Sequence, residues 1–252
     1  MRYPIYFLKA TFIYLTVVYS GTVLAGAPFV TDDPEPVAEK SIEVNYAISK
    51  AWVNGSTTAA LPSVDINYGY SDNTQLHAQS RYTYQTESGE KQSRFDNTEV
   101  GVKYRFVHLN KSDVEFMLGI YPMLQLPTGN KRLGEASGRT QAFLPIWAQF
   151  NTDKWTLYGG AGYRINNYTS SKNSLFLGVT TLYEVNNNFK IGGELFRESA
   201  AAQGNQYSSG YNLGGIYNLS KNYGLLFSAG RALNNINETN KLSAFFALQV
   251  IY

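Results

Sequence analysis

The sequence predicts an all-β protein, a transmembrane antiparallel up-and-down β-barrel of about 12 strands. Three observations predict this fold. From residue 42 onward, apolar and polar residues alternate in segments of about ten residues. The connections between these segments alternate between long polar stretches and short turns. Charged residues make up 16% of the chain and aromatic residues 15%, whereas a soluble domain has roughly 25% charged residues.

The first residues have the composition of a secretory signal peptide. Arg2 and Lys9 precede an apolar run over residues 10–18, and small residues follow. Val23 and Ala25 occupy the −3 and −1 positions of a cleavage site after Ala25. The alternative is a transmembrane anchor, but the uncharged run is barely long enough to span a bilayer and is diluted by Thr, Tyr, Ser and Gly.

This leader divides the chain into three parts. We expect residues 1–25 to be removed, residues 26–40 to form a periplasmic N-terminal segment, and residues 41–252 to form the barrel. Removing the leader takes away two basic residues, so 19 basic and 19 acidic residues remain. The balance leaves no basic stripe for nucleic acid. The chain has no cysteine, which excludes disulfides and thiolate metal sites, and we expect no cofactor.

The alternating segments form an even set, and their connections are sorted. Odd connections are longer and polar, including residues 50–62 and 85–97, and even connections are tight turns, including residues 107–113 with His108. Long loops at one end and short turns at the other are typical of outer-membrane barrels, whereas nothing in the fold of a β-sandwich requires the connections to be sorted in this way. The expected strands are residues 42–49, 63–70, 75–84, 98–106, 114–126, 141–150, 155–165, 174–184, 189–198, 210–219, 223–231 and 242–252.

Each strand has an apolar and a polar face. In residues 98–106, Val100 and Val102 share the first face, and Glu99 and Lys103 share the second. A barrel in lipid turns the apolar face outward and the polar face toward the lumen. Aromatic residues on the apolar faces gather near the short turns, which predicts an aromatic girdle: Tyr68, Tyr70, Tyr104, Phe106, Phe150, Trp155, Tyr183, Phe189, Tyr217, Tyr223 and Tyr252.

The last strand alternates up to Tyr252. We expect it to close against the first strand, because an open edge in lipid leaves backbone groups unpaired. This ending resembles the C-terminal signature of Gram-negative outer-membrane proteins, which implies recognition by the barrel-assembly machinery. The alternative is an edge strand of a soluble sheet. The sequence therefore predicts a protein of the Gram-negative outer membrane, in contact with its lipid.

Several stretches resemble the outer-membrane family described as "putative MetA-pathway of phenol degradation". The mature N-terminus GAPFVTDDPEPV is the most specific stretch, and the resemblance runs along nearly the whole mature chain. The resemblance implies a membrane barrel and, loosely, uptake of aromatic or apolar compounds. The other stretches are DNTEVGVKYRF (96–106), LPTG (126–129), YGGAGYRIN (158–166) and FLGVTTLYE (176–184).

An acidic, proline-rich stretch follows the leader. Three prolines rule out a regular ladder over residues 28–37, and Asp32, Asp33 and Glu35 crowd three acids into four positions. One interpretation is a segment folded into the periplasmic mouth as a partial plug. A second is a lead-in whose prolines prevent wrong pairing. A calcium site would need more oxygen ligands at defined offsets, so we expect no metal.

The polar faces place equal numbers of acids and bases in the lumen. A selective ion channel usually has one sign of charge at its constriction. The balance favours pairs that brace the wall, because an unpaired buried charge is costly. The alternative is a solute path lined by the pairs. The candidates are Glu43, Asp65, Arg81, Glu99, Lys103, Arg105, Glu115, Arg164, Lys190 and Glu194.

Apolar residues also point toward the lumen. Tyr121, Phe143 and Trp147 lie on neighbouring strands, and Pro122 marks a kink or bulge between them. They form a candidate solute pocket or lateral opening, or simply fill the lumen. His77 has no catalytic partner in the pattern, so we expect no enzyme. The leading hypothesis is a channel or transporter for passive uptake of small apolar or aromatic solutes. The alternative is a non-conducting structural or adhesion barrel that displays loops.

Overall fold

The computed structural model describes residues 27–252 except 88, 130–139, 168–170 and 203. The predicted signal peptide, residues 1–25, lies outside these residues. No helix in the described part of the chain has the length and apolar character that crossing a bilayer requires. The strands are β1 (Ile42–Val53), β2 (Ser56–Ser71), β3 (Thr74–Glu87), β4 (Glu90–Phe95), β5 (Thr98–Lys111), β6 (Val114–Ile120), β7 (Met123–Leu126), β8 (Gln141–Asn151), β9 (Trp155–Ile165), β10 (Ser174–Asn186), β11 (Phe189–Glu198), β12 (Ser208–Asn218), β13 (Tyr223–Ala232) and β14 (Leu242–Ile251).

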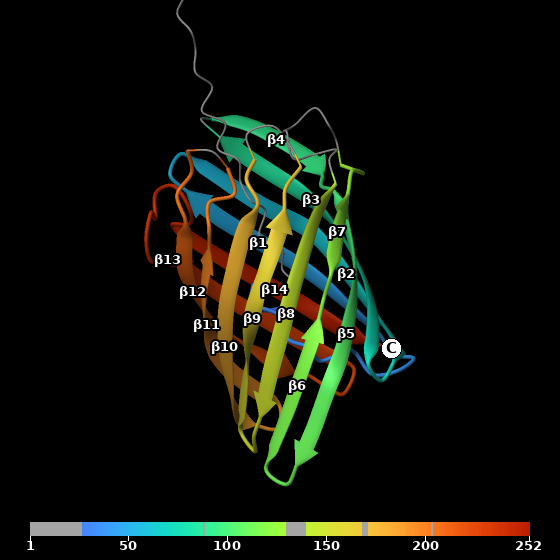
Figure 1. Ribbon diagram of the computed structural model, residues 1–252. Coiled ribbons are helices and arrows are strands. Elements are labelled where there is room, and N and C mark those ends of the chain that lie inside the picture. The colour runs from blue at the N-terminus through green and yellow to red at the C-terminus, as the bar shows by residue number, and fades with distance from the viewer. Residues whose placement is uncertain (1–26, 88, 130–139, 168–170, 203) are drawn as a thin grey trace, which may run out of the picture.

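These strands form one closed antiparallel barrel (Figure 1). β4 and β5 pair with successive parts of β3, and β6 and β7 pair with successive parts of both β5 and β8. Each of these couples is therefore one interrupted strand, and the barrel has 12 strands, as predicted. The barrel closes between β1 and β14, where the Ile42 and Tyr252 backbones exchange hydrogen bonds of 3.1 and 2.8 Å.

The barrel has two unlike ends. At one end, which we call the turn end, short turns join β2 to β3, β5 to β6, β8 to β9, β10 to β11 and β12 to β13. The opposite end, the loop end, carries the other connections. In outer-membrane barrels the short turns face the periplasm and the longer loops face the outside.

The prediction of long loops at two positions is wrong. Residues 50–62 and 85–97 are extended, and β1–β2 and β3–β4 are hairpins that turn at Gly55 and Gly89, with φ of 75° and 88°. Glycine adopts this left-handed conformation without steric cost. The small and polar residues of these stretches are typical of loops, yet their backbones pair as strands. The expected turn at 107–113 is also too long, because β5 continues to Lys111 and includes His108.

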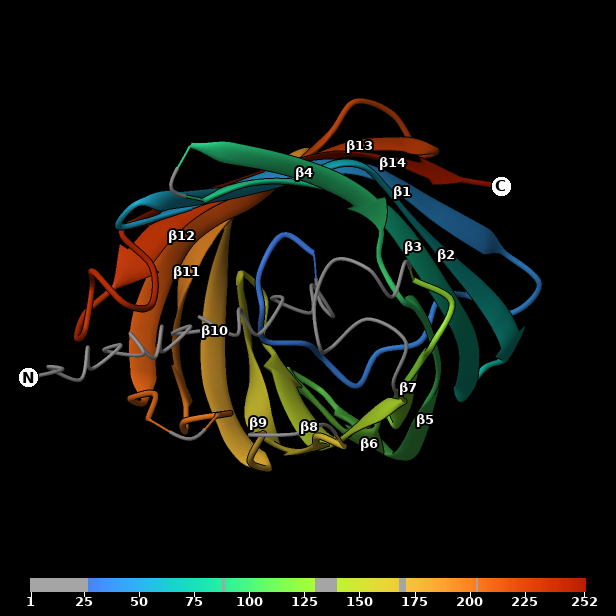
Figure 2. The ribbon, with the colours of Figure 1, turned by 90° about the horizontal axis from the view of Figure 1, so that it is seen from above.

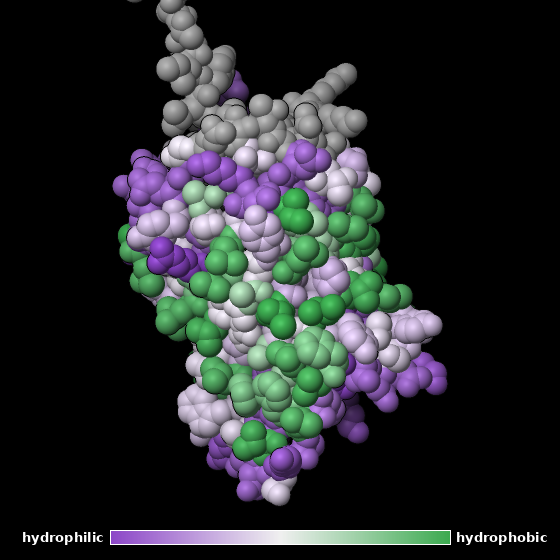
Figure 3. All heavy atoms as spheres, in the orientation of Figure 1, coloured by the Kyte–Doolittle hydropathy of each residue, from purple (hydrophilic) through white to green (hydrophobic). Residues whose placement is uncertain are grey.

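The outer surface carries an apolar band. Large apolar side chains that alternate along the strands remain exposed, and Figure 3 shows them across the middle of the barrel, with polar residues at both ends. Lipid, not water, is the solvent that suits such a surface. Residues of the predicted girdle, such as Tyr104, Trp155 and Tyr223, lie exposed near the turn end. Near the loop end, Tyr82, Tyr84 and Phe95 form an outward aromatic group that the sequence pattern did not predict.

Candidate functional site

Residues 27–40, which we call the N-terminal segment, lie inside the barrel (Figure 2). The segment ends just before β1 at the turn end, where the Lys40 N–H donates to the Gly69 carbonyl at 2.8 Å. Phe29, Thr31 and Asp32 are at most 1% exposed, as deeply buried as a protein core. Because its prolines cannot donate to a ladder, the segment crosses the lumen and contributes none of the barrel strands.

The carboxylate of Glu194 on β11 holds the backbone of the segment. It accepts hydrogen bonds from the N–H groups of Val30 at 2.9 Å and Thr31 at 2.8 Å. The side-chain amide of Asn212 on β12 also donates to this carboxylate. Hydrogen bonds to a charged acceptor are about twice as strong as neutral ones. Glu194 was predicted to face the lumen, but its contact with the segment was not.

Lys103 on β5 holds the acidic part of the segment. Its Nζ lies 3.0 Å from Asp32 Oδ1 and 3.2 Å from Asp33 Oδ1, and it donates to the Glu35 carbonyl at 3.3 Å. Burial raises the pKa of the Asp32 carboxyl above its usual range, and the Lys103 ammonium opposes that rise. The Lys103 ammonium therefore favours the charged form of the buried Asp32 carboxyl.

Two glutamines extend these polar contacts around the wall. Gln149 on β8 donates to the Glu35 carboxylate at 2.8 Å, and the Val37 N–H donates to Gln75 on β3 at 2.9 Å. At the other end of the segment, the Ser228 hydroxyl on β13 donates to the Pro28 carbonyl. The segment is thus bonded to strands on opposite sides of the barrel.

The start of the segment packs on apolar clusters of the lumen. Phe29 packs with Tyr158 and Leu182, and Val30 packs against the cluster that contains Trp147. Ala27 packs on a third cluster, which includes Phe245. These side chains face apolar partners on β8, β9, β10 and β14, so the first four described residues bury apolar surface.

Glycines in the wall leave room for the segment. A Cβ atom at Gly178 would collide with the Thr31 hydroxyl, and one at Gly69 would collide with the Ala38 carbonyl. A Cβ atom at Gly119 would lie 3.0 Å from Pro34 Cβ. Because all three glycines are on lumen-facing positions, the inner surface of the wall matches the path of the segment.

Most of the charged residues that were predicted to face the lumen contact other residues and not one another. Lys103 and Glu194 contact the segment, and Arg105 donates to the Asp72 carbonyl at 2.7 Å near the turn end. Glu43 accepts from Asn45 and Asn67 at 3.1 and 3.4 Å. The ion pairs are Arg81–Asp96 (3.3 Å), Arg164–Glu198 (3.2 Å), Glu115–His108 (2.6 Å) and Lys190–Glu184 (3.9 Å).

His77 joins the remaining two predicted acids. Its Nδ1 lies 2.9 Å from Asp65 and its Nε2 lies 3.5 Å from Glu99, and all three side chains are buried. The edge of the imidazole meets the Tyr121 ring, with 5.6 Å between ring centroids. The alternation placed His77 in the lumen, but it did not reveal that two carboxylates flank it. This arrangement braces β2, β3 and β5.

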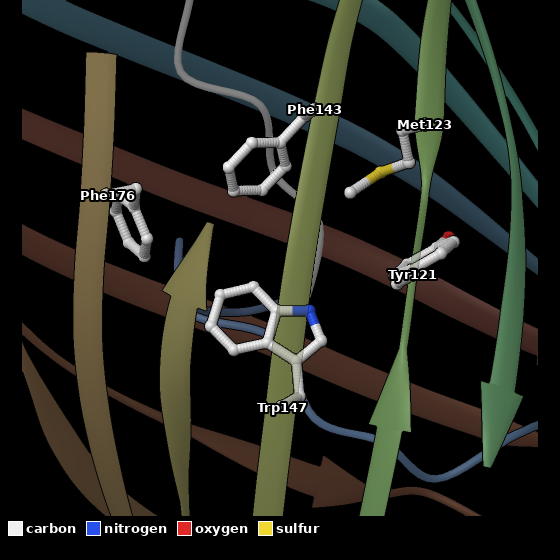
Figure 4. Close-up of a cluster of buried hydrophobic side chains, with 5 residues drawn as sticks. All are labelled: Tyr121, Met123, Phe143, Trp147 and Phe176. Atoms are coloured by element: carbon white, nitrogen blue, oxygen red, sulfur yellow. The ribbon is translucent and has the colours of Figure 1, made fainter. Parts of the chain in front are cut away.

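The candidate pocket residues come together in one buried cluster. Tyr121, Phe143 and Trp147 are at most 5% exposed and pack with Met123 and Phe176 (Figure 4). The Trp147 indole lies 6.4 Å from the Phe143 ring and 6.2 Å from the Phe176 ring. The cluster fills the lumen beside β8 and supports Val30 of the segment.

A cavity of about 520 Å³ lies on the loop side of the segment. Pro28 and Val30 line it from the segment, and Phe196 on β11 and Phe245 on β14 line it from the wall. Hydroxyl and amide side chains complete the lining, among them Thr83, Asn212 and Ser228. We call this cavity the vestibule; Tyr121, Phe143 and Trp147 are not among its lining residues. Its volume suits a small organic molecule.

Among the described residues, no group of three or more His, Cys, Asp or Glu side chains is arranged to hold a metal ion. Asp32 and Asp33 instead face the Lys103 ammonium.

A family model described as "Putative MetA-pathway of phenol degradation" matches residues 52–244. The chain belongs to this family. The matched residues run from the end of β1 to the start of β14, so they include nearly the whole barrel wall and leave out the N-terminal segment. No curated protein matches the sequence.

Solved structures resemble the fold at low sequence identity. The COG4313 outer membrane channel from Pseudomonas putida F1 aligns with a TM-score of 0.64 and 16% identity, over 87% of this chain and 98% of that one. The KdgM porin aligns with a TM-score of 0.55 and 13% identity, over 82% of this chain and 98% of that one. The protein thus shares its barrel fold with solved outer-membrane channel and porin structures.

Proposed function

We propose that the protein is a channel for passive passage of small apolar or aromatic solutes, and that the N-terminal segment acts as its plug. The observation that carries the proposal is the set of segment contacts with Glu194, Lys103, Gln149, Gln75 and Ser228, which lie on five strands around the lumen. Diffusion through the barrel requires this segment to move.

The vestibule is the entrance in this proposal. Phe196 and Phe245 offer aromatic surface to a solute, and the hydroxyl and amide groups between them can bind one or two polar substituents. A phenol combines both features. The segment forms the floor through Pro28 and Val30, so a solute in the vestibule touches the plug before it passes. The family description and the channel likeness support this class of solute only in general terms.

A specific observation favours a second candidate, a non-conducting structural barrel that displays loops. Phe29, Thr31 and Asp32 are packed as in a protein core, and such packing also suits a segment that never leaves. The two candidates make opposite predictions for a barrel that lacks the segment's lumen contacts.

Deleting residues 28–37 and recording single channels in planar bilayers distinguishes the candidates. The channel hypothesis predicts rare openings in the wild type and steady, larger conductance in the deletion variant. Heat-modifiable migration in gels and β-sheet circular dichroism establish that the variant is folded. A folded deletion variant with an unchanged trace would reject the plug, and silence in both proteins would favour the structural barrel.

Solute class is tested by uptake. Proteoliposomes with the deletion variant should admit phenols faster than neutral sugars of similar size, because the vestibule offers aromatic surface. Replacing Phe196 with Ala should reduce the difference between the two solutes, and Phe106→Ala on the outer surface is the matched control. Equal rates for phenols and sugars would remove the aromatic preference from the proposal.

A further inference from the structure

The outer surface of β11, β12 and β13 combines basic and aromatic residues at the loop end. Arg197 on β11 follows the outward-facing Leu195, and Arg231 on β13 follows the outward-facing Ala229, so both arginines point away from the lumen. Both are exposed. The Arg197 guanidinium lies 4.2 Å from the centre of the Tyr207 ring, and Tyr211 is the register partner of Arg231.

No carboxylate offsets these two charges on the outer face. The outward positions of β11, β12 and β13 contain no Asp or Glu. Glu198, next to Arg197 in sequence, belongs to the opposite face and pairs with Arg164 at 3.2 Å. In the described part of the chain, neither Arg197 nor Arg231 forms an ion pair. An uncompensated positive pair on a lipid-facing surface needs an anionic partner.

The height of the arginines matches a headgroup layer. Arg197 follows Phe189 of the aromatic girdle by eight residues, and Arg231 follows Tyr223 by eight residues. Eight strand residues span about 26 Å along the strand, which is about 20 Å across the bilayer at a tilt of about 40°. Because the apolar band of such barrels is about 25 Å tall, the long arginine side chains reach its far edge.

The spacing of the arginines fits two phosphates of one molecule. In the strand register, Arg197 on β11 lies opposite Ser209 on β12, and Arg231 on β13 lies opposite Tyr211 on the other side of β12. With strands about 4.8 Å apart, their Cα atoms are roughly 12 Å apart. Guanidinium groups bind phosphate through two parallel hydrogen bonds. The tyrosines add flat surface and hydroxyl groups suited to sugar rings.

We propose that this surface, Arg197, Tyr207, Tyr211 and Arg231, binds the bisphosphorylated disaccharide of lipid A, the anchor of lipopolysaccharide in the outer leaflet. Lipid A has a phosphate at each end of a disaccharide, and its acyl chains would lie along the apolar band below the arginines. The occupant follows from the loop end facing the outer leaflet and from the charge and spacing of the site. It does not depend on whether the lumen conducts.

Native mass spectrometry in detergent tests the proposal with three probes: bisphosphorylated lipid A, the same lipid without phosphates, and phosphatidylglycerol. The wild type should bind bisphosphorylated lipid A in preference to both others. In the double variant R197Q/R231Q, that binding should weaken about 30-fold, since each arginine at an anionic surface contributes roughly a factor of five. The matched control K154Q/K221Q removes two charges at the turn end and should bind as the wild type does.

The opposite results would overturn the proposal that this surface binds lipid A. Unchanged lipid A binding by folded R197Q/R231Q would exclude these arginines as the site. Equal binding of the dephosphorylated lipid would exclude phosphate recognition. Equal binding of phosphatidylglycerol would show attraction to any anionic lipid instead of a site for two phosphates. Heat-modifiable gel migration checks folding, and all four altered side chains lie on the surface and leave the lumen unchanged.

Discussion

The two halves of the N-terminal segment are held by different physics. Residues 27–30 pack their side chains on apolar clusters, with Phe29 between Tyr158 and Leu182. In residues 32–35, Asp32 and Asp33 instead face the Lys103 ammonium, and the Glu35 carboxylate accepts from Gln149. The first half gains from leaving water, and the second half is costly to bury unless every charge is paired. The acidic half is therefore the one that a single change of charge can release.

The largest effect is expected for K103M, which leaves the buried Asp32 and the half-buried Asp33 without their cation. Breaking a buried pair in this way costs roughly 3–5 kcal/mol, and the segment avoids the cost by leaving the lumen. Open probability in single-channel records should rise at least 100-fold, at about 1.4 kcal/mol per factor of ten.

The triple variant K103M/D32N/D33N is the control for this prediction. It removes the lysine and both acids, so no buried charge lacks a partner and closure should largely return. A folded K103M protein that stays closed would mean that Lys103 does not hold the segment.

F29A is expected to have the next largest effect, and it probes the apolar half. Removing the buried ring costs roughly 3 kcal/mol. The segment should remain bonded to Lys103 while residues 27–30 loosen. Cysteine labelling tests this directly, because the chain has no cysteine of its own: a V30C probe should react faster in F29A, and a V37C probe, which keeps both acids, much less so. Equal acceleration at both probes would show that the halves do not act separately.

E194Q tests the junction between the halves. The amide keeps one acceptor oxygen but sets an NH₂ group against one of the two backbone N–H groups, so a charge-assisted bond worth about 2 kcal/mol is lost. Hydrogen–deuterium exchange of a peptide covering residues 28–34 should accelerate at Val30 and Thr31. Exchange identical to that of the wild type would contradict a role for Glu194 as a clamp.

S228A should have the smallest effect, because it removes one neutral hydrogen bond to the Pro28 carbonyl. Such a bond contributes about 1 kcal/mol, so open probability should rise roughly fivefold. The matched control is S243A on the neighbouring strand, where the hydroxyl bonds to the Gly230 carbonyl and not to the segment. The comparison fails if S243A opens the channel as much as S228A does.

Alternation predicted the strands and their faces, because both follow from a period of two along the chain. Closure of the barrel was predicted from the cost of unpaired edge backbone groups in lipid. It could not predict length where polarity is ambiguous. Residues 56–60 are small or hydroxyl-bearing, which suits a loop, yet they form the upper part of β2. No large apolar residue alternates through residues 56–60 to mark them as a strand.

The contacts of the site were harder to predict for a different reason. Alternation places Glu194 and Lys103 in the lumen, but it says nothing about what they meet across it. Their partners Thr31 and Asp32 lie 163 and 71 residues away in sequence. The proline and acid pattern of residues 28–37 suggested a segment that avoids the sheet, and only the fold brings it to these side chains.

The attachment of the segment at Ser41 has a kinetic consequence. The Ser41 carbonyl accepts from the Gly69 N–H at 3.0 Å, and β1 begins at the next residue, so one end of the segment stays fixed at the rim. A released segment remains tethered at an effective concentration in the millimolar range for a short flexible linker. Return is then a first-order step, and the lifetime of an opening should not change when the protein is diluted.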